Sequence, residues 1–370
     1  GYSNNNYTEY GVETSINFPN FLFPFLSSDF KRRIRATTEF GLQYNYQLRP
    51  EFLRTMASAN WSYKWTQRQK IQHRIDLINI GFLYLPRISD RFREDYINKG
   101  QNHIFQYNYQ DRLIVNMGYS YNYNSVGGSI VNNTIASNSY SIRFNFESAG
   151  NILYALSKVA NIRKNDNGEY AILGIPYAQY LKGEFDFAKN IRIDHRNSFA
   201  FHVGLGIAVP YGNAKTIPFE KQYFSGGANS VRGWSVRGWA VRDLGPGSFS
   251  GNGNLLDQSG DIKLDASIEY RSKLFWKFQG AVFVDAGNIW TIRNYANQPG
   301  GVFKFDKFYK QIAVAYGLGL RLDLDFFILR FDGGMKAVNP AFETKKERFP
   351  IIHPKFSRDF AFHFAVGYPF

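Results

Sequence analysis

Residues 312–324 read Ile-Ala-Val-Ala-Tyr-Gly-Leu-Gly-Leu-Arg-Leu-Asp-Leu, and this stretch decides the fold class. Every second residue is large and apolar, whereas the residues between them are Ala, Gly, Arg or Asp. Successive side chains of a β-strand point to opposite faces, so the stretch predicts a strand with one apolar and one small or polar face. Strands of soluble proteins average about 5–6 residues, whereas a tilted strand that crosses a bilayer needs about 9–11. This stretch has the length of a membrane-crossing strand.

The same alternation recurs along the whole chain. It is clear over residues 36–48, 57–66, 115–123, 199–207 and 262–271. In each of them, small or polar residues occupy the face opposite the apolar one. About fourteen such segments can be counted, separated by turns rich in Asn, Asp, Gly and Pro. A soluble β-sandwich would alternate over shorter strands, so we predict an all-β protein that forms a transmembrane antiparallel β-barrel.

Composition agrees with a barrel and excludes several other classes. The chain of 370 residues contains 35 Phe, 25 Tyr, 6 Trp and no Cys, which removes disulfides, thiol catalysis and Cys-ligated metals. Its longest apolar stretches, such as 21–26 and 312–320, fall short of the roughly 18–20 residues of a transmembrane helix. The net charge is +14, but the basic residues are spread along the chain and often lie near acidic ones. We therefore expect no nucleic acid among the partners.

One long segment, about residues 210–260, breaks the alternation. It is rich in Gly and Ser, and it contains the pair Gly226 and Gly227 followed by Val231-Arg-Gly-Trp234. A second Val-Arg-Gly-Trp unit ends at Trp239. Long loops without regular structure of their own are usually functional or disordered. We therefore take this loop as the principal candidate site.

Three further motifs accompany the loop: Phe283-Val-Asp-Ala-Gly-Asn-Ile-Trp290, Gly317-Leu-Gly-Leu-Arg-Leu-Asp323 and Gly367-Tyr-Pro-Phe370. Together with the loop they resemble the BamA and TamA family of outer-membrane assembly barrels. The last motif and the phrase Glu13-Thr-Ser-Ile-Asn-Phe-Pro-Asn-Phe-Leu-Phe-Pro24 look closest to the TamA-like TamL branch. The resemblance implies an integral protein of the bacterial outer membrane.

The resemblance also sets an expectation for domain organisation. Barrels of this family have sixteen strands and follow periplasmic POTRA domains, whereas we count about fourteen strands and find nothing like a POTRA domain. We therefore expect residues 1–370 to be a barrel domain, with its long loop at about 210–260 entering the lumen. The POTRA domains and the first hairpin are expected to lie outside this chain.

In this family the Arg of the loop motif is held by acidic residues on the inner wall of the following strands. Alternation directs Glu269 and Asp285 inward, at the positions where the resemblance places these partners. Arg232 lies at the expected distance from the Gly-Gly turn, whereas Arg237 lies at the expected distance from Leu244-Gly-Pro. We favour Arg232, because the preceding turn would set its direction.

An arginine fork that grips two carboxylates away from water makes directional, charge-assisted bonds, which could fix a mobile loop. The predicted loop lock consists of Arg232, Gly233, Trp234, Arg237, Glu269 and Asp285, with Gly226 and Gly227 as its turn. The alternative is that these arginines are loop cations that bind lipopolysaccharide phosphates.

The terminal strand, residues 360–370, is the second candidate feature, and its alternation places Tyr368 and Phe370 on the same apolar face as Phe360, Phe362, Phe364 and Val366. An aromatic end on an alternating strand resembles the recognition signal of outer-membrane barrels in general, and Gly and Pro pair poorly in a sheet, which would weaken the closing seam. In the family that seam opens laterally, so that nascent strands pair with an exposed edge. The predicted gate residues are Phe360, Phe362, Phe364, Val366, Gly367, Tyr368, Pro369 and Phe370.

The predicted function is an outer-membrane protein assembly or translocation factor, which inserts or translocates β-barrel or surface proteins through a lateral gate. The alternatives are a two-partner-secretion-type translocase and a passive outer-membrane pore. Expected partners are unfolded outer-membrane proteins, the lipid bilayer and lipopolysaccharide, and accessory subunits of an assembly complex. The six histidines show no metal-ligand spacing, and Ser198 and His202 are too far apart on a strand to bond directly. We expect no enzymatic activity, no metal and no cofactor.

Overall fold

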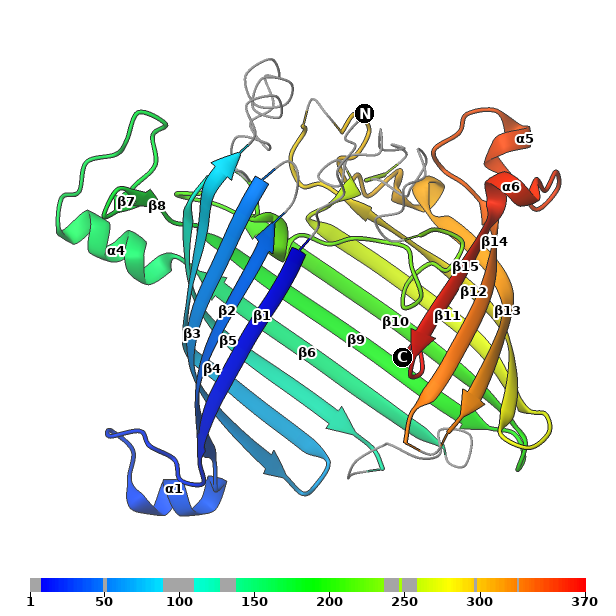
Figure 1. The fold of residues 1–370 in the computed structure, drawn as a ribbon, viewed down its shortest axis with the longest axis horizontal. Helices are drawn as coiled ribbons and strands as arrows, with labels where there is room; N and C mark the ends of the chain where they lie inside the picture. Colours follow the sequence, from blue (N-terminus) through cyan, green and yellow to red (C-terminus); the bar gives the residue numbers. More distant parts are fainter. Residues whose placement is uncertain are drawn as a thin grey trace. The chain divides into compact units, whose positions relative to one another are not determined.

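The computed structural model describes residues 8–48, 52–88, 110–126, 138–235, 246–247, 258–295, 298–324 and 326–370. Thirteen strands of these ranges belong to one antiparallel sheet, whose order follows the chain from β1 to β6 and from β9 to β15 (Figure 1). The remaining two, β7 and β8, pair with each other. The all-β prediction is confirmed, with one strand fewer in the main sheet than the approximate count from the sequence.

The strands are β1 (Thr8–Phe18), β2 (Thr37–Leu48), β3 (Phe52–Gln67), β4 (Ile71–Ile88), β5 (Arg112–Asn124), β6 (Ser139–Ala149), β7 (Ala171–Ile172), β8 (Ile175–Pro176), β9 (Tyr180–Arg192), β10 (Asn197–Pro210), β11 (Ile262–Lys273), β12 (Phe278–Trp290), β13 (Ala313–Asp323), β14 (Ile328–Val338) and β15 (Phe360–Val366). The helices are α1 (Ser28–Ile34), α4 (Asn151–Val159), α5 (Lys345–Arg348) and α6 (Phe356–Asp359), and short 3₁₀ turns are η2 (Phe219–Lys221) and η4 (Phe308–Gln311). Among the described helices, none is both long enough and apolar enough to cross a membrane.

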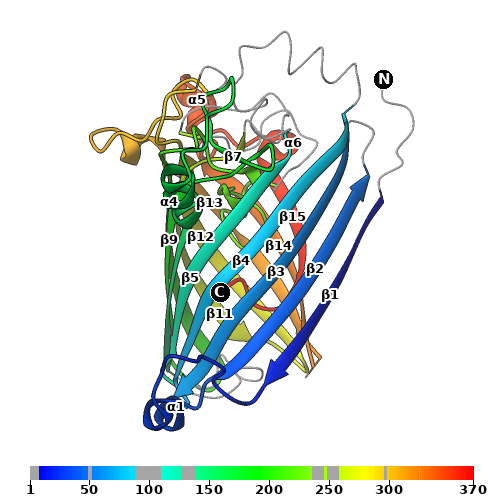
Figure 2. The same ribbon diagram turned by 90° about the vertical axis from the view of Figure 1, so that its left-hand side faces the viewer.

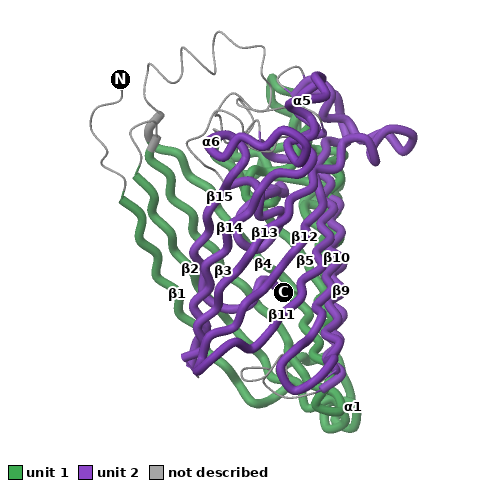
Figure 3. The backbone as a smooth tube through the Cα atoms, turned by 90° about the vertical axis from the view of Figure 1, so that its right-hand side faces the viewer, with its two compact units in different colours: residues 1–122, 145–183, 208–221 green, residues 123–144, 184–207, 222–370 purple. Residues whose placement is uncertain are grey.

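The chain divides into two compact units, coloured separately in Figure 3. Unit 1 consists of residues 1–122, 145–183 and 208–221, and unit 2 consists of residues 123–144, 184–207 and 222–370. In unit 1, β1 to β4 form consecutive antiparallel pairs, and β2 and β3 pair without interruption. Figure 2 shows α1, in the connection from β1 to β2, and α4 at opposite ends of these strands.

Unit 2 contains the pairs from β10 to β15, again in chain order and antiparallel. Exposure alternates along these strands as the sequence predicts, and the exposed face is the apolar one, the reverse of a soluble sheet. On β13, Leu318 is 68% exposed, whereas Arg321 is 0% exposed. On β11, Ile268 is half exposed, whereas Glu269 and Arg271 are buried.

This inversion determines the environment of the sheet. A water-soluble sheet buries its apolar face and almost never buries an unpaired charge. Here the apolar face of the unit 2 strands from β10 to β15 is the exposed one, and their charged and small residues are packed inside. Such strands are suited to lipid on their outer face and to a polar, side-chain-filled interior.

Candidate functional site

The loop that follows β10 makes a tight turn on the inner side of unit 2. Its start is set by Gly226 and Gly227, whose φ angles of 101° and 86° lie in the region that favours glycine. The Gly227 N–H donates to the carbonyl oxygen of Trp234 at 2.6 Å, which closes the turn over residues 227–234. Within it, the Ser230 hydroxyl donates to Asp265 on β11 at 2.7 Å. The turn therefore presents the Val-Arg-Gly-Trp motif to the neighbouring strands in a fixed conformation.

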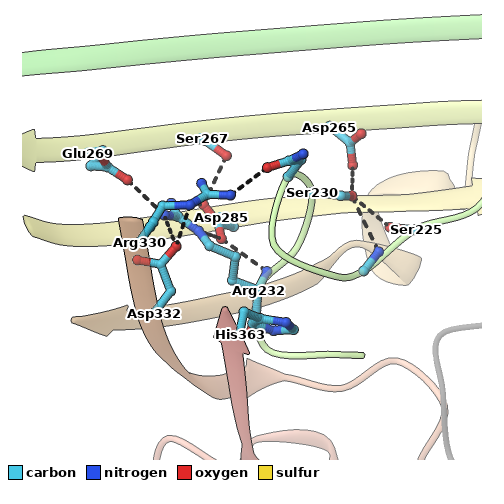
Figure 4. A network of polar contacts seen from close by, with 12 residues as sticks. Ser225, Ser230, Arg232, Asp265, Ser267, Glu269, Asp285, Arg330, Asp332 and His363 are labelled. Carbon is cyan, nitrogen blue, oxygen red and sulfur yellow. Dashed lines mark hydrogen bonds and ion pairs between the residues drawn. The ribbon is translucent and has the colours of Figure 1, made fainter. Parts of the chain in front are cut away.

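The guanidinium of Arg232 lies among three inward-facing carboxylates (Figure 4). Its Nε and Nη2 atoms donate to the two oxygens of Asp285 at 2.8 and 2.9 Å, which forms a fork on β12. Its Nη1 atom donates to Glu269 on β11 at 2.7 Å and to Asp332 on β14 at 3.3 Å. The backbone N–H of Arg232 also donates to Asp285, at 3.0 Å. Since Arg232 is only 1% exposed, these bonds form away from solvent, where charge-assisted bonds are strongest.

Three further arginines belong to the same buried cluster. Glu269 accepts a hydrogen bond from Arg271 at 2.7 Å and lies 2.9 Å from Nη2 of Arg321. Asp332 lies 3.5 Å from Nε of Arg330. The cluster thus holds four guanidinium groups against three carboxylates, a formal excess of one positive charge. Shared carboxylates of this kind link the positions of all the cations to one another.

Packing supplements the polar contacts on both sides of Arg232. The ring of Phe283 on β12 lies under the guanidinium, with 3.5 Å from Cζ to the ring centroid, a cation–π contact. Trp234 packs with Val231 against Ala313 and Ala315 of β13 in a small buried apolar cluster. One aromatic ring thus stacks on the guanidinium, and the other holds the neighbouring loop residues against β13.

The loop backbone is held as closely as its side chains. The carbonyl oxygen of Arg232 accepts a hydrogen bond from Nε2 of His363 on β15 at 2.9 Å. It also lies where a Cβ atom would stand at Gly334 on β14, so only glycine permits this approach. A strand side chain also donates to the loop: Nη2 of Arg330 donates to the side-chain oxygen of Asn229 at 2.5 Å.

These contacts can be compared with the predicted lock. The structure brings together Arg232, Gly233, Trp234, Glu269 and Asp285, whereas Arg237 lies outside the described residues. Sequence reasoning missed several of the partners in the cluster. The sequence did contain a signal for the partners on strands 313–323 and 328–338. The charged residues there alternate with apolar ones, which places them on the inward face. The missed residues are Phe283, Arg321, Arg330, Asp332 and His363.

The terminal strand is shorter than the predicted one. Pairing of β15 with β14 extends from Phe360 to Val366, and the chain then turns at Gly367, whose φ angle is 89°. The prediction that residues 367–370 continue the strand, with Tyr368 and Phe370 on its apolar face, is therefore wrong. Glycine at positive φ allows the chain to leave the sheet at this point.

The rings beyond Gly367 instead contact inward-facing side chains. The hydroxyl of Tyr368 donates to Gln279 on β12 at 2.9 Å, and the guanidinium of Arg271 lies 4.6 Å from the Tyr368 ring centroid. The ring of Phe370 stacks on His202 of β10 at 5.1 Å. The tail thus covers a cation of the same buried cluster that holds the loop.

A separate buried carboxylate lies at the other end of the loop. Asp261, directly before β11, is fully buried and accepts a hydrogen bond from the Ile292 N–H at 3.0 Å. Burial raises the pKa of Asp261 to about 6, although that hydrogen bond and the charge of Arg293 act in the opposite direction. This carboxyl therefore titrates within the physiological range.

An inverted sheet with an ion-paired loop on its inner side defines the class of membrane β-barrel proteins. The chain belongs to the Omp85 superfamily, because residues 1–370 match the Omp85 superfamily domain over their whole length.

One curated protein and two solved structures illustrate what this chain is similar to, and the family indicates an integral protein of the bacterial outer membrane. The outer membrane protein assembly factor BamA of Neisseria meningitidis serogroup B is 32% identical over 100 residues, which are 25% of this chain and 11% of that protein. The crystal structure of BamA from Haemophilus ducreyi, lacking POTRA domains 1–3, is similar over 97% of this chain and 62% of that one, with a TM-score of 0.60 and 16% identity. CdiB from Acinetobacter baumannii matches with a TM-score of 0.36 and 13% identity over 97% of this chain and 56% of that one. The chain therefore spans less than two thirds of the length of these relatives.

Proposed function

We propose that this protein is an outer-membrane assembly or translocation factor, which inserts or translocates β-barrel or surface proteins through a lateral gate at its terminal strand. The observation that carries the proposal is the buried cluster around Arg232, in a chain of the Omp85 superfamily. The cluster anchors a long loop to the strands that precede the end of the sheet. A passive pore needs no such anchor. An interior that is filled by a loop and its ion pairs would also oppose free diffusion.

The short pairing of β15 supports the gate in this proposal. Only residues 360–366 pair with β14, whereas β13 and β14 each have eleven residues. A strand with few ladder bonds is easily exchanged for another strand, and an edge with free N–H and C=O groups is a template for β-augmentation. The work is noncovalent, and we propose no enzymatic step, cofactor or metal.

The finer assignment to a TamA-like role, close to the TamL branch, rests on the sequences Glu13–Pro24 and Gly367–Phe370. Partners under this proposal are unfolded outer-membrane proteins and accessory subunits of an assembly complex. Lipopolysaccharide and phospholipid surround the barrel.

The test is an insertion assay with the protein reconstituted in liposomes. A urea-unfolded outer-membrane barrel is added, and its folding is followed by its shift in gel mobility. Folding faster than in empty liposomes is the expected result. Steady conductance without any acceleration would instead indicate a pore, and export of one dedicated passenger without effect on other barrels would indicate a two-partner-secretion translocase.

A matched pair of substitutions connects the assay with the terminal strand. Gly367→Val disfavours the positive φ angle at the inward turn and so favours continuation of β15, which should slow insertion. Gly168→Val is the control, because Gly168 also has a positive φ angle and an empty surrounding but lies in a turn remote in sequence. Equal insertion rates for the two variants would show that the terminal strand takes no part in the mechanism.

A further inference from the structure

The connection between β1 and β2 folds back onto the outer face of its own strands. On that face, Phe40 and Leu42 of β2 are exposed, as expected for lipid-facing residues. Thr38 shares the face but is 0% exposed, and its cross-strand neighbour Tyr63 on β3 is 3% exposed. Both residues are buried because the connection covers them.

Specific bonds hold this covering segment in place. The Thr38 hydroxyl donates to the carbonyl oxygen of Asn20 at 2.7 Å and accepts from the N–H of Leu22 at 3.0 Å. The Tyr63 hydroxyl donates to the carbonyl oxygen of Leu22 at 3.2 Å. The segment is therefore a built part of the outer wall at this end of the strands.

The covering segment continues the aromatic surface of the wall toward its rim. The ring centroid of Tyr63 lies 4.6 Å from that of Phe21 and 6.2 Å from that of Phe23. Phe25 follows at 5.7 Å from Phe23 and is 87% exposed. A row of rings thus passes from the lipid-facing strands to an uncovered ring at the tip.

Basic residues begin directly after this row. Helix α1 starts at Ser28, with Ser27 as its N-cap, and carries Lys31, Arg32 and Arg33, followed by Arg35 at its end. The one acidic residue of the helix is Asp29. The turn from β3 to β4, at the same end of the strands, adds Arg68 and Lys70, both exposed. Figures 1 and 2 show α1 projecting beyond the strand ends on the outer side of unit 1.

We propose that residues 19–35 form a foot that rests in the headgroup layer of the membrane and binds anionic glycerophospholipids. Its aromatic row is continuous with the lipid-facing wall, so the bilayer already lies against it. Aromatic rings are favoured at the membrane interface, and clustered Lys and Arg beside them are attracted to anionic headgroups. The long connection that follows β6, which contains α4, lies at the opposite end of the unit 1 strands from α1 (Figure 2). Because outer-membrane barrels carry their long loops outside, the foot lies in the periplasmic leaflet, whose lipids are glycerophospholipids.

The absence of cysteine from the chain gives a direct test. A single Ser28→Cys substitution is labelled with an environment-sensitive fluorophore, and the barrel is reconstituted in phosphatidylethanolamine vesicles with or without phosphatidylglycerol. Nitroxide lipids that quench near the headgroups report contact. Asn167→Cys, in an exposed turn, is the matched label site. Strong quenching at Ser28 and weak quenching at Asn167, enhanced by phosphatidylglycerol and reduced by salt, is the expected result.

Charge and ring are then removed separately in the labelled protein. Lys31, Arg32, Arg33 and Arg35 are changed together to Gln. This should lower the equilibrium constant for binding of the foot to anionic headgroups by more than about a hundredfold, since each such residue contributes about fivefold. Phe25→Ser should reduce quenching in both vesicle types. Lys345→Gln with Lys346→Gln, in the exposed α5, is the control and should change nothing.

These side chains are exposed or half-buried, so the variants should still show the gel shift of a folded barrel. Equal quenching at Ser28 and Asn167 would overturn the foot. Quenching at Ser28 that is insensitive to lipid charge and to the Gln variant would overturn the anionic selectivity. Label protection only after addition of a periplasmic protein would assign the surface to a protein partner instead. None of these outcomes depends on insertion activity, so the foot and the proposed function are tested separately.

Discussion

The charge balance around Arg232 leads to a prediction about the order of two destabilising substitutions. The buried cluster has four arginines and three carboxylates. Arg232→Ala leaves three charges of each sign, whereas Asp285→Ala leaves four cations against two anions. Although Arg232 makes more bonds in the cluster, loss of Asp285 should therefore destabilise the folded barrel more.

Breaking a buried ion pair by removing one partner costs about 3–5 kcal/mol. We place Arg232→Ala near the lower value, about 3 kcal/mol, because the remaining groups can pair with one another. Asp285→Ala belongs near the upper value, about 5 kcal/mol, because the excess charge grows in a site without water. The double variant returns to an excess of one positive charge. Its effect should therefore fall short of the sum of the single effects by at least about 2 kcal/mol.

The measurement is urea unfolding in detergent micelles, followed by gel mobility and Trp fluorescence, for the wild type, both single variants and the double variant. Arg237→Ala provides the comparison for the second motif unit and should have the smaller effect of the two arginine variants. If Arg232→Ala proves at least as destabilising as Asp285→Ala, and the double variant is additive, the charge-balance reasoning is refuted.

Two further predictions concern the loop. Gly334→Ala should destabilise loop docking by about 1–3 kcal/mol, because the added methyl group collides with the carbonyl oxygen of Arg232, whereas Gly280→Ala meets only ordinary contacts and should be nearly neutral; the same unfolding assay separates them. Asp261 has a folded-state pKa of about 6 against an ordinary value of 3.8, so between these values the folded protein binds more protons than the unfolded one. Stability should therefore fall by up to about 3 kcal/mol as the pH rises from about 4 to about 7. Asp261→Asn should remove that loss, and an unchanged pH profile in this variant would contradict it.

Much of the fold followed from alternation, because a strand's two faces are encoded at every second residue. The inward positions of Glu269, Asp285 and Arg321 were readable in this way, and the structure buries all three. Alternation cannot say which inward residues on different strands meet, since that depends on register and on the path of the loop. Asp332 and His363 were missed for this reason, although each is inward-facing on its own strand.

The tail shows the limit of the same reasoning. Residues 360–370 continue the period without a break, yet the strand stops at Val366. A single glycine backbone angle decides the outcome, and the apolar pattern does not encode it. A continued strand would have turned the rings of Tyr368 and Phe370 to lipid. They instead contact the inward-facing side chains of Arg271 and His202. The periodicity of a sequence gives the faces of a strand more reliably than its end.

The turn of residues 227–234 contacts every one of the last five strands. It reaches β11 through Asp265 and Glu269, β12 through Asp285, β13 through the Trp234 cluster, β14 through Asp332 and β15 through His363. The apolar faces of these strands are turned outward, and the buried apolar cluster around Trp234 is small. Directional bonds from one loop therefore add to the backbone pairing that holds the five strands together. Release of the loop would remove these bonds from all five strands at once, and the lateral gate of the proposed function requires such a coordinated loosening.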